Sequence, residues 1–327
     1  MWTRETRAEH DRDDQRYPSD LTDAERQVLA PLLPPPARTG RRRSWTMREI
    51  MNAMFYVLRG GCPWRMLPEH FPPHQTAYRW FTRFRDDGTW ERLDHQLVAR
   101  DRERVGRGVG PTAAVIDTQS VKTTESGGLR GYDAGKKING RKRHALVDTG
   151  GRSLELQVHP ASVQDRDGAP AVLQAAHARF PSIRKVFADS VYAGERVANA
   201  TSIVVEIVRK LPNQVGFKLL PRRWVVERFF AWVNRNRRLA KGFEATIASA
   251  TAFLHAARQA AGSFGLRFES DSQLICARNA LDCASGRTSL RVATYRGPYP
   301  ACMGCKIYIQ VPVQSVGKHQ FRDIVSQ

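Results

Sequence analysis

The apolar pattern of the chain changes near residue 101, and this change constrains the fold more than any other feature. Before it, apolar residues recur at helical spacing, and after it come short apolar runs that are typical of strands. These runs are AAVIDT (113–118), KRHALVDTGGRSLELQV (142–158), SIRKVFADS (182–190), SIVVEIV (202–208) and VGFKLL (215–220). Helical signals lie at about 167–179 and at 221–238. This order predicts an α/β domain whose mixed sheet is flanked by helices.

The first hundred residues predict an all-α region. Thr22 and Glu25 stand at capping-box spacing, and so do Thr46 and Glu49, so each pair indicates the start of a helix. A third helix is expected within PPHQTAYRWFTRFRDDG (72–88), whose apolar residues recur at helical spacing.

The third helix has a second, polar face that carries Thr76, Arg79 and Arg83. A short helix with an apolar side and an arginine-bearing side, preceded by another helix, is typical of a helix-turn-helix that contacts DNA. The alternative is a charged face that is merely solvated. The residues expected to contact DNA in this region are Thr76, Arg79, Arg83 and the loop residues Arg41, Arg42 and Arg43.

The formal net charge of +20 and the isoelectric point of about 10.4 indicate a polyanionic partner. Lysine and arginine bind phosphates and release counterions, so nucleic acid is the expected partner. The alternative is a basic surface that serves solubility or a ribosome-like assembly. No run reaches the roughly 20 apolar residues of a membrane span, and the charged N-terminus lacks an apolar signal core, so we expect a cytoplasmic protein.

Two acids end apolar strands. Asp117 ends AAVID and Asp189 ends RKVFAD. Sites in α/β sheets form at strand ends, so the two carboxylates converge if the strands are neighbours. Two close carboxylates raise each other's pKa unless a cation lies between them, and a divalent ion with oxygen ligands meets that need.

A third acid, Glu227, lies in the basic helical segment PRRWVVERFFAWVNRNRR (221–238), where it shares a face with Arg223 and Asn234. Taken alone, Glu227 is interpreted as the acidic partner of an ion pair with Arg223 or Arg228. With Asp117 and Asp189, it completes a set of three carboxylates that suits a pair of divalent ions and in-line phosphoryl transfer.

The motifs VIDTQSVKT, FADSVYAG and RRWVVERFFAWVNRNRRLAKGFE resemble the DDE transposases of bacterial insertion sequences, in particular the insertion-sequence-five group. The resemblance covers roughly residues 17–262. It implies an RNase H-like catalytic domain behind a helix-turn-helix domain, with Asp117, Asp189 and Glu227 as catalytic residues and metal ligands. It further implies Mg²⁺ or Mn²⁺ and no organic cofactor. The implied partners are double-stranded DNA, at the terminal inverted repeats and at the target, and a second copy of the chain on that DNA. The implied location is bacterial cytoplasm, at the nucleoid.

The resemblance divides the chain into a helix-turn-helix domain (17–100), a catalytic domain (101–262) and an atypical extension (263–327). Two positions depart from the group's Tyr-Arg-Glu-Lys signature: Leu220 stands for the tyrosine and Asn234 for the lysine. Arg235 or Arg237 is a candidate for the missing charge. The segment from Gly194 to Phe217 is also shorter than usual for the group.

A basic run follows the first acid, and it is expected to track the DNA backbone unless it forms a solvated hairpin edge. Its members are Lys122, Lys136, Lys137, Arg141, Lys142, Arg143 and His144. The DNA contacts predicted for the catalytic domain are Lys122, Lys142, Arg223 and Arg235. His144 is interpreted as structural, Asp148 as a turn residue, and Asp165 and Asp167 as loop and helix-cap residues. Tyr192 is expected either to stack near the metal site or to pack.

The extension carries Cys276, Cys283, Cys302 and Cys305, and Cys62 lies far upstream. Four thiolates can bind Zn²⁺, but the spacing of the first pair does not fit a zinc site well. The alternative is a poorly packed extension acquired by fusion. Rival functions are a DNA-binding protein without catalysis, a metal-dependent nuclease that does not join strands, and a decayed copy.

Overall fold

The structure is a computed structural model that describes residues 12–36, 38–125, 128–208 and 223–260. Several predictions from the sequence fall elsewhere: the strand at 215–220, the departure at Leu220, and the extension with its four cysteines lie outside the described residues. Cys62, which lies within them, is a free thiol.

The N-terminal region is helical, as predicted. Helix α2 (Asp23–Leu29) begins at Thr22 with a complete capping box, and a 3-10 turn, η1 (Ala30–Leu32), follows it. Helix α3 (Met47–Gly60) begins at Thr46, whose side chain accepts a hydrogen bond from the Glu49 N–H. It ends at Gly61, whose φ of 73° is the left-handed conformation that glycine adopts without strain.

Helices α4 (His74–Asp86) and α5 (Thr89–Arg104) complete this region, after a short 3-10 turn, η2 (Trp64–Met66). The buried face of α4 carries Ala77, Phe81 and Phe84. The boundary predicted at residue 100 falls inside α5, because this helix runs on toward the first strand.

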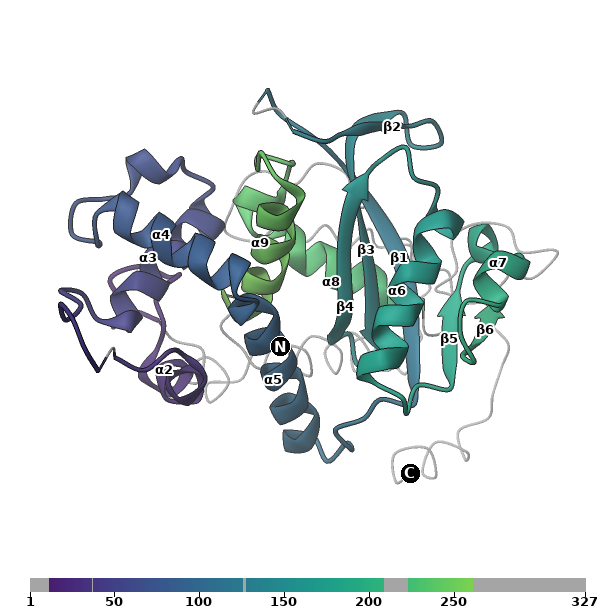
Figure 1. Cartoon of the computed structure of the whole chain (residues 1–327), viewed down its shortest axis with the longest axis horizontal. Coiled ribbons are helices and arrows are strands. Elements are labelled where there is room, and N and C mark those ends of the chain that lie inside the picture. The colour runs from purple at the N-terminus through teal and green to yellow at the C-terminus, as the bar shows by residue number, and fades with distance from the viewer. Residues whose placement is uncertain (1–11, 37, 126–127, 209–222, 261–327) are drawn as a thin grey trace, which may run out of the picture. The chain divides into compact units, whose positions relative to one another are not determined.

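The second region contains a mixed sheet of six strands in the part of the chain that the structure describes (Figure 1). The strands are β1 (Ala113–Lys122), β2 (Gly131–Asp133), β3 (Ile138–Asp148), β4 (Ser153–Pro160), β5 (Lys185–Ala188) and β6 (Val204–Ile207). β3 pairs antiparallel with β1, β2 and β4, whereas β5 runs parallel to β1 and β6. The mixed sheet predicted from the order of apolar runs is confirmed, although β2 gave no signal.

Helices cover both faces of the sheet. On one face, α8 (Trp224–Asn234) and α9 (Ile247–Ala260) pack on the β1–β3–β4 strands, and a short turn, η4 (Arg237–Leu239), joins the two helices. On the other face lie α6 (Asp165–Arg179), the turn η3 (Ser190–Tyr192) and α7 (Glu195–Ala198). Strands buried on both sides explain the continuous apolar runs in the sequence.

One hydrophobic core joins the helical region to the sheet, because residues of α2 to α5 pack with residues of β1, β3, β4, α8 and α9. Phe81 of α4 stacks on Phe253 of α9 with 4.3 Å between ring centroids. A buried polar cluster adds to this contact. Asp94 of α5 accepts hydrogen bonds from Ser153 and His255, and its Oδ1 lies 3.2 Å from Arg258 Nε. α5 is therefore fixed to both β4 and α9.

The β3–β4 hairpin turns at Asp148, as the sequence predicts. Its Oδ1 accepts hydrogen bonds from the backbone N–H groups of Gly150 and Arg152, at 2.8 and 2.9 Å. Its Oδ2 forms a buried ion pair with Arg102 of α5. Asp148 therefore shapes the turn and also fixes it to the helix that precedes the sheet.

Candidate active site

Strand pairing places Asp117 beside Asp189. β1 and β5 are parallel neighbours, and Val115 pairs with Phe187. Each acid lies two residues farther along its strand direction, so both acids lie at the same level, where β5 ends. β1 continues to Lys122, so the prediction that Asp117 ends its strand is wrong. The convergence expected from two apolar runs that end in an acid follows from this register.

Backbone hydrogen bonds hold one oxygen of each aspartate. The Thr118 N–H donates to Asp117 Oδ1 at 2.7 Å, and the Val191 N–H donates to Asp189 Oδ1 at 2.8 Å. The second bond is the cap of η3. Neither backbone donor was predicted from the sequence. The Asp189–Ser190 pair directly after β5, which is typical of a local turn, is a signal for the second donor, whereas Asp117 and Thr118 lie within β1 and give no such signal.

Glu227 joins the two aspartates through Arg223. Nη2 of Arg223 lies 3.7 Å from Asp117 Oδ2, 3.6 Å from Asp189 Oδ2 and 4.0 Å from Glu227 Oε1. Arg223 is the N-cap residue of α8, and Glu227 lies one turn later. The structure therefore gathers the three predicted acids around one guanidinium. The fixed Oδ1 atoms leave the Oδ2 atoms to face this cation.

Burial sets the electrostatics of the site. It raises the pKa of Asp117 to about 6, and the nearby Asp189 carboxylate adds to this increase. The Thr118 N–H, Arg223 and Lys136 oppose it by favouring the ionised carboxylate. The side chain of Glu227 is 53% exposed, compared with 19% for that of Asp117. The site thus combines one deeply placed acid with one that is open to solvent.

The donor set fits a hard divalent cation. Within the described ranges, no group of three or more acids, histidines or cysteines is arranged to hold a metal ion. Arg223 lies within 4.0 Å of all three carboxylates. Its guanidinium shows that one oxygen of each acid can face a single positive charge. Carboxylate oxygens are the ligands that Mg²⁺ prefers in proteins.

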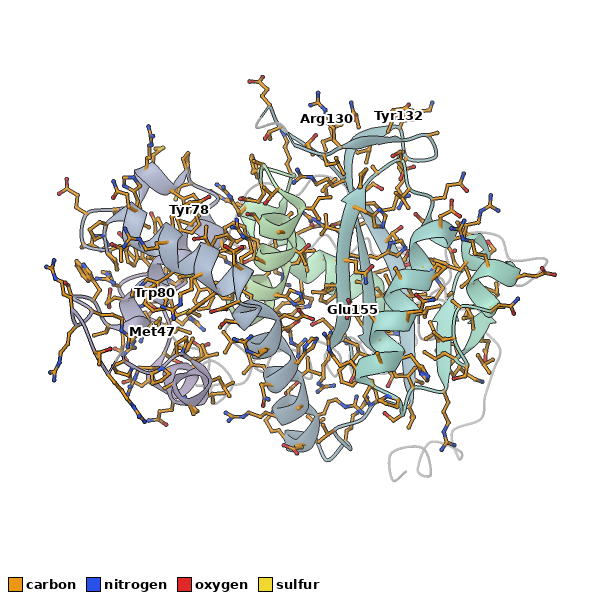
Figure 2. All side chains as sticks on the ribbon, in the orientation of Figure 1. Met47, Tyr78, Trp80, Arg130, Tyr132 and Glu155 are labelled. Carbon is orange, nitrogen blue, oxygen red and sulfur yellow. The ribbon has the colours of Figure 1, made fainter. Side chains whose placement is uncertain are left out.

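The predicted DNA contacts of the helical region lie on or near one surface. Arg79 and Arg83 of α4 are exposed, and Thr76 is half-buried. Figure 2 shows the neighbouring Tyr78 and Trp80 on this helix. The guanidinium carbons of Arg43 and Arg83 lie 5.6 and 4.9 Å from the Trp80 ring centroid. Trp80 thus links the basic loop, where Arg41 and Arg42 are also exposed, to the polar face of α4.

The basic run on β3 requires a correction. Lys142 is only 4% exposed, and its Nζ lies 2.6 Å from Asp165 and 3.4 Å from Asp133. Lys142 therefore stabilises the interior and is withdrawn from the predicted DNA contacts. Arg141 and Arg143 are buried as well, so this part of the run is not a solvated hairpin edge, whereas Lys122, Lys136 and Lys137 are exposed. This burial could not be predicted from the sequence, because charged residues usually indicate an exposed strand. Here other elements cover both faces of β3 and bury its charged residues.

The other predicted residues are placed as follows. Lys122 and Arg235 are exposed, and the Arg235 guanidinium lies 4.1 Å from the Trp232 ring centroid. Asn234 is exposed at the end of α8. Tyr192 is 2% exposed, and burial together with the nearby acids raises its pKa, so its hydroxyl stays protonated.

His144 and the acids of α6 have structural positions. His144 Nδ1 lies 2.6 Å from His159 Nε2, and burial lowers the pKa of His144 to about 3. Helix α6 begins at Asp165 and its cap is Gln164, so the interpretation of Asp165 and Asp167 as loop and helix-cap residues is wrong. Both lie in the first turn, where negative charge favours the helix dipole.

Comparisons with known families agree with this geometry. Residues 21–93 match the family described as "Putative transposase of IS4/5 family", and residues 109–257 match the family "Transposase DDE domain". No curated protein matches the chain. The two matched ranges follow one another and contain the helical region and the sheet with its three gathered acids. The chain therefore belongs to the DDE transposases, with an RNase H-like catalytic domain behind an N-terminal region of the IS4/5 type.

Proposed function

We propose that the protein moves an insertion sequence by binding its terminal inverted repeats, cutting the DNA strands there, and joining the freed ends to target DNA. The observation that carries this proposal is the convergence of Asp117, Asp189 and Glu227 on Arg223. A repressor derived from a transposase has no need to keep three acids within 4.0 Å of one cation.

The acids would hold Mg²⁺ or Mn²⁺, in keeping with the divalent metal use of the DDE family. When bound, the ions would supply activation of the attacking water or 3′ hydroxyl and stabilisation of the leaving oxygen. The Thr118 and Val191 N–H groups orient the two aspartates for this task. Arg223 offsets the repulsion between the acids and offers a bidentate group to a DNA phosphate.

DNA recognition is proposed for the surface around Trp80. Arg79, Arg83 and Thr76 would enter or border a groove of the DNA, while Arg41, Arg42 and Arg43 would contact the backbone. In the catalytic region, Lys122 and Arg235 would contact phosphates.

Synapsis of two element ends by a homodimer, and location in the bacterial cytoplasm at the nucleoid, complete the proposal. Among the described residues, no helix has the length and apolar character needed to cross a bilayer.

The test is strand cleavage of DNA that carries the two edges of the element, in the presence of Mg²⁺. Wild type should nick the ends and yield joined products, whereas Asp189→Asn should do neither. A matched control is Asp167→Asn, an acid of α6 that pairs with Arg196 instead of facing the site. Equal nicking by wild type and Asp189→Asn would contradict the proposed catalytic role of the three acids. Nicking without joined products would favour a stand-alone nuclease.

A further inference from the structure

A groove with a volume of about 510 Å³ opens at the end of β1, away from the acids. Its lining comes from the end of β1, the segment before β2, and the loop between η4 and α9. The lining residues are Lys122, Thr123, Thr124, Glu125, Arg130 and Lys241. Figure 2 shows Arg130 and Tyr132 at the β2 end of the sheet.

The groove carries more positive than negative side chains. Lys122, Arg130 and Lys241 come from three separate segments, and all three are exposed. Within the part of the chain that the structure describes, none of them forms an ion pair, while Glu125 is the one acid of the lining. Cations that converge on a concave surface attract a polyanion, because their fields add.

The two sides of the groove are fixed to each other by the backbone. The Gly242 N–H donates to the Lys122 carbonyl at 2.7 Å, and the Thr124 N–H donates to the Gly242 carbonyl at 3.3 Å. Lys241 is therefore held beside the end of β1. Main-chain hydrogen bonds therefore determine the spacing between the segments that carry the cations of the groove.

Arg141 fixes the third segment from beneath. Its guanidinium donates to the carbonyl of Leu129, next to Arg130, at 2.9 Å. It also donates to the carbonyls of Glu244 and Ala245 in the loop before α9, at 2.6 and 3.1 Å. One buried side chain thus holds both loops that carry the groove's cations.

The groove is tied to the acids through the elements that carry them. Lys122 lies five residues beyond Asp117 on β1, which is about 17 Å at the usual rise of a strand. Lys241 follows α8, the helix of Glu227, by way of η4.

We propose that this groove binds the phosphate backbone of duplex DNA while the acids act on another phosphate of the same duplex. The contact is independent of sequence, because lysine and arginine on phosphates position a duplex without reading bases. This proposal rests on the proposed function, since it takes DNA as the molecule that enters the site.

The first test is protection of lysines from acetylation in the full-length wild-type chain. The protein is treated with acetic anhydride, with and without a 40-base-pair duplex, in the absence of divalent ions, and modification is read by mass spectrometry. Lys122 and Lys241 should be protected by the duplex. Lys185, which pairs with Glu206 at the start of β5, is the internal control and should be modified equally in both samples. Equal modification of Lys122 and Lys241 with and without DNA would overturn the proposal.

The second test measures the salt dependence of duplex binding. Replacing Lys122, Arg130 and Lys241 together by Gln should reduce the slope of log K against log salt by about 2.7, because each lost phosphate contact removes about 0.9. The control variant replaces Arg184, Lys185 and Arg196 by Gln, which removes the same charge elsewhere on the catalytic region. A slope that falls equally in both variants would contradict a specific groove.

These binding measurements separate the two proposals. They need neither metal nor catalysis, so a protein that fails the cleavage test can still show protection of Lys122 and Lys241. Conversely, a protein that cuts and joins DNA without protecting these lysines keeps the proposed function and loses the groove.

Discussion

At the scale of single residues, the site depends on one buried acid whose charge is costly. Burial raises the pKa of Asp117 to about 6, so the folded protein holds this proton more tightly than the unfolded chain does. The protonated form is favoured below that value, and the ionised form that a cation needs exists above it. The raised pKa therefore reduces the stability of the folded state as the pH rises from about 4 through about 6.

Asp117→Asn should consequently increase the free energy of unfolding at pH 7.5, by about 1–3 kcal/mol, while removing cleavage activity. At pH 4, where the wild-type carboxyl is protonated in the folded protein, the two proteins should differ little. Urea unfolding at both pH values measures this. An unchanged or lower stability of Asp117→Asn at pH 7.5 would show that burial of this carboxylate is not costly.

Arg223→Gln should raise the pKa of Asp117 further, because it removes the cation that favours the ionised form. The pH below which metal-free Asp117 is protonated should shift upward. A carboxyl-detected NMR titration measures the shift, with Arg228→Gln as the control on the same helix. Arg228 donates to the Gly150 carbonyl, away from the acids. A pKa that is unchanged in Arg223→Gln would contradict the role given to this guanidinium.

At the scale of elements, much of the fold could be predicted from the sequence. The helix starts at Thr22 and Thr46, the β3–β4 hairpin, and the apolar strand segments that lead to Asp117 and Asp189 follow from local spacing alone. The continuation of β1 to Lys122 does not. The convergence of the two aspartates needed the assumption that their strands are neighbours, and that of Glu227 needed in addition the packing of its helix on the sheet. Burial of Lys142 and Arg141 could not be predicted, because their partners Asp165, Leu129 and Glu244 come from other parts of the chain.

Helix α6 gives a test of such long-range packing. A Cβ at Gly168 would lie 2.5 Å from His144 Cε1 and 2.9 Å from His159 Nε2. Gly168→Ala should therefore lower the free energy of unfolding by about 1–3 kcal/mol through overpacking. At Gly60 of α3, where a Cβ meets no atom within 4 Å, Ala should stabilise by about 0.5–1 kcal/mol. Thermal unfolding of both variants checks the opposite signs, and a stabilised Gly168→Ala would contradict the packing described.

Helix α4 gives a test of the DNA contacts. Arg79→Ala should weaken binding to the element's ends by about 1–3 kcal/mol if this exposed side chain contacts a base, and should relax the preference for those ends. Arg166→Ala, an exposed arginine of α6, is the control. Competition binding against unrelated duplex measures both effects. Equal binding by Arg79→Ala and wild type would remove α4 from the DNA surface.

At the scale of the whole molecule, the helical region and the sheet share one core, so they are expected to unfold together. Asp94 of α5 links the helical region to the sheet region, because it pairs with His255 and Arg258 of α9 and with Ser153 of β4. Neither the sequence spacing nor the family motifs indicated this buried cluster.

Asp94→Ala should lower the free energy of unfolding by about 3–5 kcal/mol, since it leaves Arg258 buried without its partner. Wild type should show a single urea transition when followed both by tryptophan fluorescence, to which buried Trp90 contributes, and by far-UV circular dichroism. Asp148→Asn tests the second link through Arg102 and should weaken the same transition. Two separate transitions in wild type would show that the regions fold independently.

The hydrogen bonds by which Arg141 holds the two loops of the groove have a consequence for the electrostatic potential of the molecule. Its guanidinium bonds the neutral carbonyl oxygens of Leu129, Glu244 and Ala245, and the Glu244 carboxylate, which pairs with Arg238, acts on it only through space. The side chain is only 1% exposed, and solvent screens such a charge less than one at the surface. The Arg141 side chain that holds the two loops together is thus also a fixed source of positive potential beneath them. This potential does not depend on the conformation of any surface lysine.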